Sequence, residues 1–122
     1  MTARILVVED DADLRSLLIE QLAAAGFAAI PAPSAEAALD LIGREDCAAV
    51  LLDNVLPGVT GLQALAMLRR RSRAPVLMMT GHYDSSFRQD AFMLGAAEVL
   101  AKPFSPARLK AAIEKALRIQ HP

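Results

Sequence analysis

The stretch Ile5-Leu6-Val7-Val8-Glu9-Asp10 decides the fold class of this chain, because a continuous apolar run ends directly in two acids. Short continuous apolar runs are typical of strands that are buried on both faces of a parallel sheet. The pattern recurs three times, and a polar or charged residue again follows each run. The four expected strands cover residues 4–8, 48–52, 75–79 and 97–101, and the later polar residues are Asp53, Thr80 and Lys102.

Helical segments are expected between these strands, because apolar residues recur there at helical spacing, as at Leu14, Leu18 and Leu22. Residues that favour helix starts precede several of these segments. They are Ser34, Asp84 and the pair Ser105-Pro106. A weaker strand at 28–30 lies just before Pro31, which favours a position at the sheet edge. Five β-α units joined by right-handed crossovers predict one doubly wound α/β domain.

The composition describes one ordinary globular domain of 122 residues, with 54% hydrophobic residues and a net charge of −1. Such a charge gives no bulk attraction to nucleic acid or to an acidic membrane. The single cysteine, Cys47, cannot form an internal disulfide, which fits a reducing cytoplasm. No apolar run approaches the ~18 residues of a membrane-spanning helix, and the chain enters its first strand without a signal-peptide segment. We therefore expect a cytoplasmic protein.

The polar residues at the strand ends are the candidate site. Ligands of open parallel sheets bind outside the carboxyl ends of the strands, so these side chains should share one crevice. The set comprises Glu9, Asp10, Asp53, Thr80 and Lys102. Three acids, a hydroxyl and a cation suit a divalent metal ion and a phosphoryl group. Mg²⁺ is the expected metal, because it prefers oxygen ligands and would relieve the repulsion among the acids.

Each of these residues also has an ordinary structural explanation. Glu9, Asp10 and Asp11 could simply favour the positive end of the first helix dipole. Asp53 could form a turn, Thr80 could finish a strand and Lys102 could be a solvated lysine. The metal interpretation gains over helix capping because Asp53 stands at the end of a second strand, where an acid directly after an apolar run is costly without a function.

Taken together, the motifs resemble the receiver domain of bacterial two-component response regulators over essentially the whole chain, residues 1–122. Four segments in the same order and spacing carry the resemblance. They are Val7-Val8-Glu9-Asp10-Asp11, the segment from Leu52-Asp53 through Leu56-Pro57 to Thr60-Gly61, Thr80-Gly81, and Lys102-Pro103-Phe104. The resemblance implies a flavodoxin-like three-layer sandwich whose five-stranded parallel sheet has the strand order 2-1-3-4-5.

The resemblance also implies a role for each site residue. Asp53 would take a phosphoryl group from a phosphohistidine on a sensor histidine kinase or phosphotransfer protein. Asp10, Asp53 and the backbone carbonyl of Val55 would bind Mg²⁺, with Glu9 acting mainly through a bound water. Lys102 would pair with one phosphoryl oxygen, and Thr80 would move to hydrogen-bond another. Such a chain assists its own phosphorylation and is not an enzyme acting on a separate substrate.

The sequence departs from the family pattern mildly at two positions and sharply at one. Glu9 replaces the commoner aspartate and Leu56 replaces methionine, whereas Val99 stands where receivers often carry an aromatic ring. We expect Thr80 still to switch, with the signal leaving through the backbone of Gly81-His82-Tyr83 and the next helix. An apolar Val55 cannot orient an attacking water, so we also expect a long-lived phosphoryl group.

Two other functions remain open at this stage. One is a degenerate receiver that binds partners without phosphorylation, and the other is a small Mg²⁺-dependent phosphohydrolase. The signal could pass to an effector domain or lead to self-association. We do not expect this domain itself to bind nucleic acid or a membrane. The basic run Arg69-Arg70-Arg71-Ser72-Arg73 fits a solvated helix end. His82 and His121 are too far apart in sequence to indicate a zinc site.

Overall fold

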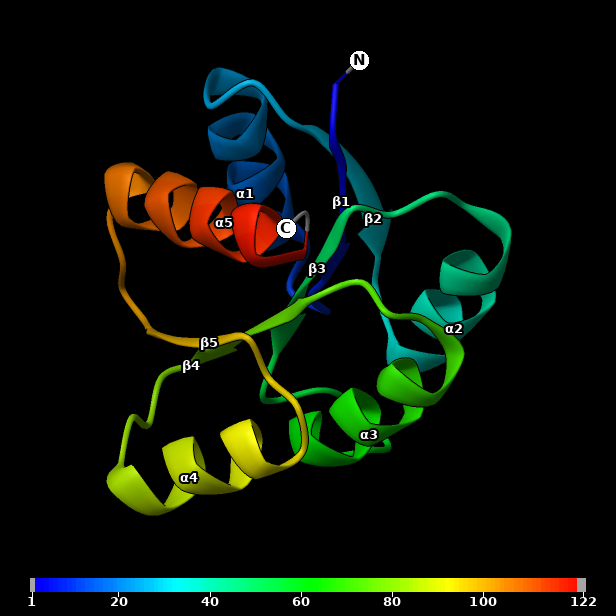
Figure 1. Cartoon of the computed structure of the whole chain (residues 1–122), viewed down its shortest axis with the longest axis vertical. Coiled ribbons are helices and arrows are strands. Elements are labelled where there is room, and N and C mark those ends of the chain that lie inside the picture. Colours follow the sequence, from blue (N-terminus) through cyan, green and yellow to red (C-terminus); the bar gives the residue numbers. More distant parts are fainter. Residues whose placement is uncertain (1, 121–122) are drawn as a thin grey trace.

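The computed structural model describes residues 2–120, and within that range five strands and five helices alternate along the chain (Figure 1). The strands are β1 (Arg4–Val8), β2 (Ala28–Ala32), β3 (Ala49–Asp53), β4 (Val76–Thr80) and β5 (Glu98–Ala101). The helices are α1 (Ala12–Ala24), α2 (Ala35–Arg44), α3 (Gly61–Arg71), α4 (Ser85–Met93) and α5 (Pro106–Gln120). All strand pairs are parallel in the order β2-β1-β3-β4-β5, which confirms the predicted doubly wound sheet.

The sheet is the middle of three layers, with α1 and α5 on one face and α2, α3 and α4 on the other (Figure 1). Successive residues of a strand point to opposite faces. In β1, Val7 therefore packs in a cluster with Leu18 and Ile113, while Val8 packs in the other cluster with Leu65. Both faces of the sheet are buried, which explains why the strands are apolar apart from a few residues at their ends.

Three strands begin one residue later than predicted, and this changes how the site residues are held. Asp53 and Thr80 are the last residues of β3 and β4, not the first residues of the loops that follow. In the parallel ladder Asp53 is paired with Met79, and Thr80 with Ala101. Both residues stay in their strands, although their side chains are polar, because their backbones still pair with the neighbouring strand. The sheet therefore fixes both backbone positions.

The predicted edge strand is confirmed and is two residues longer than expected. β2 pairs only with β1 and runs through Pro31, which is exposed. An edge position tolerates proline because the missing N–H can face solvent. The described residues include no helix long and apolar enough to cross a membrane.

The predicted helix starts are also found in the structure. The side chains of Asp11, Ser34 and Asp84 accept hydrogen bonds from backbone N–H groups in the first turns of α1, α2 and α4. Ser105 Oγ accepts from the N–H of Arg108 in α5. These caps fix where each helix leaves the sheet, and so fix the loops at the carboxyl ends of the strands.

Candidate functional site

The three acids of the candidate site converge at the carboxyl ends of β1 and β3. Carboxylate oxygens of Glu9, Asp10 and Asp53 all lie within 4.8 Å of one another. Glu9 and Asp53 are buried, whereas Asp10 is exposed. Three carboxylates this close repel each other strongly unless cations neutralise them. The arrangement therefore calls for positive charge at this end of the sheet.

Lys102 supplies one positive charge to the cluster. Its Nζ donates to Asp53 Oδ1 at 2.9 Å and to Glu9 Oε1 at 3.3 Å. Its backbone N–H donates to the carbonyl of Thr80 at 2.8 Å, and a cis peptide bond links it to Pro103. Burial opposes the charge, but the hydrogen bonds and ion pairs with Asp53 and Glu9 together outweigh this effect and raise the pKa of Lys102 above its ordinary value. Lys102 is therefore a fixed cation beside Asp53.

The cluster fits a small divalent cation in its donor chemistry. One lysine cannot balance three carboxylates, and the remaining donors are hard oxygens of the kind that Mg²⁺ prefers. Asp10 is open to solvent, so a cation held there could keep part of its water shell. The described residues thus provide both the charge deficit and the ligand type of a magnesium site.

Burial makes Glu9 a weaker acid than usual. The residue is 1% exposed, and burial together with the neighbouring Asp53 raises the pKa of Glu9 from 4.5 to about 7. Its Oε2 accepts from the N–H of Asp11 at 3.2 Å, which partly opposes the rise. Glu9 is thus partly protonated near neutral pH when no metal ion is bound.

This pKa gives a pH dependence of stability with a defined sign. Between pH 4.5 and about 7 the folded state binds more protons at Glu9 than the unfolded state does. The contribution of Glu9 to the free energy of unfolding therefore falls as pH rises through this range, by on the order of 3 kcal/mol without metal. We expect urea titrations in EDTA from pH 5 to 8 to show this fall. Glu9→Gln should flatten it, and equal slopes for the two proteins would contradict the assignment.

The backbone carbonyl of Thr80 accepts a hydrogen bond from the N–H of Lys102, whereas its hydroxyl is hydrogen-bonded to His82. The side chain is 1% exposed, and its Oγ1 accepts from the N–H of His82 at 3.1 Å and donates to the carbonyl of His82 at 3.2 Å. The hydroxyl therefore closes a small turn at the start of the β4–α4 loop. Val99, on the neighbouring strand β5, is buried at 2% exposure. His121 lies outside the described residues.

The loop after β3 is held by contacts that the motif spacing alone did not reveal. Gly61 donates to the carbonyl of Asn54 at 2.9 Å, and a Cβ at Gly61 would lie only 2.5 Å from Asn54 Cα. Thr60 and Gln63 form a capping box at the start of α3. The sequence signal for it was a threonine followed three residues later by glutamine. Val55 pairs with Thr60 across this loop, and its side chain is 69% exposed.

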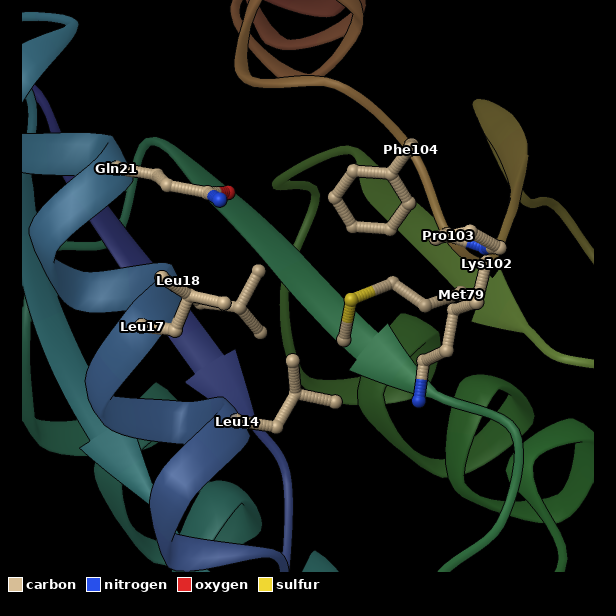
Figure 2. Close-up of a pocket in the computed structure, with 8 residues that line it drawn as sticks. All are labelled: Leu14, Leu17, Leu18, Gln21, Met79, Lys102, Pro103 and Phe104. Carbon is tan, nitrogen blue, oxygen red and sulfur yellow. The ribbon is translucent and has the colours of Figure 1, made fainter.

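An apolar cavity of about 360 Å³ lies beside Lys102, between α1 and the β5–α5 loop (Figure 2). Leucines of α1 form one wall, Pro103 and Phe104 form the other, and the stem of Lys102 borders it. In Figure 2 the amine of Lys102 points away from Phe104, toward the end of β3. Among the side chains that the structure describes, those of residues 2–118, Gln21 Oε1 is the only buried polar atom without a hydrogen-bond partner.

Comparison with known proteins finds one consistent family. The family model described as the response regulator receiver domain matches residues 5–114. The transcriptional regulatory protein FixJ of Bradyrhizobium diazoefficiens is 38% identical over 119 residues, which cover 97% of this chain and 58% of FixJ. The crystal structure of a CheY-like receiver domain from Methanospirillum hungatei superposes with a TM-score of 0.91 at 26% identity, covering 98% of this chain and 97% of that one.

A third match shows a modified state. The crystal structure of a response regulator from Burkholderia pseudomallei, described with a phosphorylated aspartic acid, calcium ion and citrate, has a TM-score of 0.86 and 28% identity over 97% of this chain and 71% of that chain. The chain spans about half the length of the first curated relatives that it matches, between 48% and 58%.

Proposed function

Because the chain belongs to the response regulator receiver domain family, we propose that it is a signalling switch that accepts a phosphoryl group on Asp53. The observation that carries this proposal is the buried Asp53 carboxylate, with Lys102 Nζ 2.9 Å from its Oδ1 and two more acids beside it. Phosphoryl transfer depends mainly on in-line positioning and on neutralising the phosphoryl oxygens. Lys102 beside the Asp53 carboxylate, and a cation bound by the acidic cluster, would supply the neutralisation.

The proposed reaction assigns a task to each residue. An oxygen of Asp53 attacks the phosphorus of a phosphohistidine, the P–N bond breaks, and the imidazole leaves with the electron pair and takes up a proton. Lys102 pairs with a phosphoryl oxygen. Asp10, Asp53 and the backbone carbonyl of Val55 would hold Mg²⁺, with Glu9 contributing through a water. Bound Mg²⁺ would supply neutralisation of the phosphoryl oxygens.

The experiment that tests this function uses acetyl phosphate as a small donor. With Mg²⁺, we expect the intact mass of the chain to rise by one phosphoryl group, and with EDTA we expect no rise. A degenerate receiver would gain no phosphoryl group under either condition. A phosphohydrolase would instead turn over an aryl phosphate many times, which the proposed acceptor would not do.

The proposed partners follow from the chemistry of the site. A sensor histidine kinase or a phosphotransfer protein would present the phosphohistidine. The apolar cavity between α1 and the β5–α5 loop would offer such a partner an apolar surface beside Lys102, the lysine whose Nζ donates to Asp53. The response would pass to an effector domain or to self-association, and this domain itself would not bind nucleic acid.

The neighbour of the phosphoacceptor should set the lifetime of the phosphoryl group. The side chain of Val55 is 69% exposed, two residues after Asp53, and has no group that could orient a water. We expect Val55→Asn to shorten the phosphoryl lifetime several-fold, because the amide can hold a water for attack. Decay of the phosphorylated mass in Mg²⁺, after acetyl phosphate is removed, measures this. Equal lifetimes in both proteins would reject the role of Val55.

Thr80 is proposed to pass the signal to the β4–α4 loop without help from an aromatic residue. To reach a phosphoryl oxygen, its hydroxyl must leave both backbone groups of His82. We expect the phosphoryl mimic beryllofluoride to shift the amide NMR signals of Gly81, His82 and Tyr83, and Thr80→Val to abolish these shifts while mimic binding persists. An unmoved loop in the wild-type complex would contradict this route.

A further inference from the structure

Arg15 of α1 contacts main-chain carbonyls of the acidic loop that carries Glu9 and Asp10. Its Nη1 donates to the carbonyl of Glu9 at 2.8 Å and, at a longer 3.4 Å, to the carbonyl of Asp10. No backbone N–H among residues 2–120 donates to either carbonyl. Within the described part of the chain, Arg15 is thus the group that hydrogen-bonds these two carbonyls.

Arg15 donates to main-chain carbonyls and not to the carboxylates of the acidic cluster. Across the described residues Arg15 forms no ion pair, although three acids lie close by. Its guanidinium binds main-chain oxygens and leaves the carboxylate oxygens of the cluster to Lys102 and to a cation. A lysine-like charge that paired with Asp10 would instead compete with the metal ion.

Asp10 is the residue of this loop whose orientation depends most on the contact with Arg15. Glu9 is fixed by its own N–H, which donates to Ala32 at 3.1 Å, and by its Oε2, which accepts from Asp11. Asp10 is exposed, and its carboxylate makes no hydrogen bond within residues 2–120. The direction of its side chain therefore depends on the two peptide groups around it, and Arg15 contacts the carbonyls of both.

We propose that Arg15 is a positioning residue that orients the Glu9–Asp10 peptide and so preorganises the acidic cluster for a divalent cation. The inference rests on the proposed function, since the cation serves phosphorylation of Asp53. Groups that orient metal ligands typically contribute about tenfold or more to metal affinity. Arg15 is expected to act by geometry, because its positive charge alone would weaken the binding of a cation.

Two substitutions separate geometry from charge. Arg15→Lys keeps the charge on a side chain one bond shorter, and Arg15→Gln removes the charge as well. We expect both to weaken Mg²⁺ binding about tenfold, measured by NMR titration of the Asp10 and Asp11 amides. We also expect the phosphorylation rate with acetyl phosphate to recover at saturating Mg²⁺. Arg70→Lys, an exposed arginine at the far end of α3, is the matched control and should bind Mg²⁺ as the wild type does.

The outcomes that overturn the inference are distinct. Unchanged Mg²⁺ affinity in Arg15→Lys would refute positioning, and tighter binding in Arg15→Gln would show that only charge matters. Equal amide hydrogen exchange at Asp10 and Asp11 in wild type and Arg15→Lys would also contradict it. A wild-type chain that neither binds Mg²⁺ nor gains a phosphoryl group would overturn the proposed function itself.

Discussion

Replacing Asp53 by asparagine is expected to abolish phosphorylation of the chain. The amide has nearly the same shape as the carboxylate, but it lacks the charged oxygen that must attack phosphorus. We expect neither Glu9 nor Asp10 to replace Asp53, because Asp53 is the acid nearest to Lys102 Nζ, at 2.9 Å against 3.3 Å for Glu9. Intact-mass measurement after incubation with acetyl phosphate and Mg²⁺ should therefore show no added phosphoryl group.

The matched control for this substitution is Asp46→Asn. Asp46 is exposed and lies before β3, at the opposite end of the strand from Asp53. The Asp46→Asn protein should gain one phosphoryl group at the wild-type rate. Full phosphorylation of Asp53→Asn would show that another residue is the acceptor, and the proposed function of Asp53 would then be wrong.

Removing Lys102 is expected to have the second largest effect, and the effect should depend on metal. Lys102→Ala leaves two buried carboxylates without their cation. Breaking a buried pair costs about 3–5 kcal/mol, and the quarter exposure of this lysine lowers the expected loss to roughly 2 kcal/mol. Mg²⁺ should restore most of that loss and bind more tightly than in the wild type, because the competing cation is gone. Phosphorylation should nevertheless slow, since one phosphoryl oxygen loses its partner.

Urea unfolding in EDTA and in Mg²⁺ measures this difference. Lys110→Ala is the control, because Lys110 is exposed on α5 and forms no ion pair within residues 2–120. It should change stability little under either condition. A loss in Lys102→Ala that is the same with and without Mg²⁺ would mean that the lysine and the metal ion do not share the carboxylates.

The sheet and the convergence of the acids were predictable because they depend on local pattern and on topology. Apolar runs of four or five residues mark buried strands, and parallel strands place their carboxyl ends at one edge. The positions of Glu9, Asp53 and Lys102 follow from those two facts alone. Helix starts were predictable at Ser34 and Asp84 for the same reason, since capping is a contact between near neighbours in sequence.

Contacts set by the direction of a single side chain were not predictable. The hydroxyl of Thr80 bonds to His82, and the guanidinium of Arg15 turns back to the loop before its helix. Neither contact leaves a periodic signal. Methionine is more often a core residue than a surface residue, yet Met93 of α4 is 85% exposed. Phe87 and Ala91 define the inward side of α4, and Met93 lies on another side. The helical spacing of Phe87 and Ala91 predicts the exposed position of Met93 better than its residue type does.

Peptide mapping of the phosphorylated chain tests the central claim most directly. After reaction with acetyl phosphate and Mg²⁺, mass spectrometry should place one phosphoryl group on the peptide that contains Asp53, and fragmentation should assign it to that residue. A phosphoryl group on any other residue, or none after full reaction with Mg²⁺, would contradict the account.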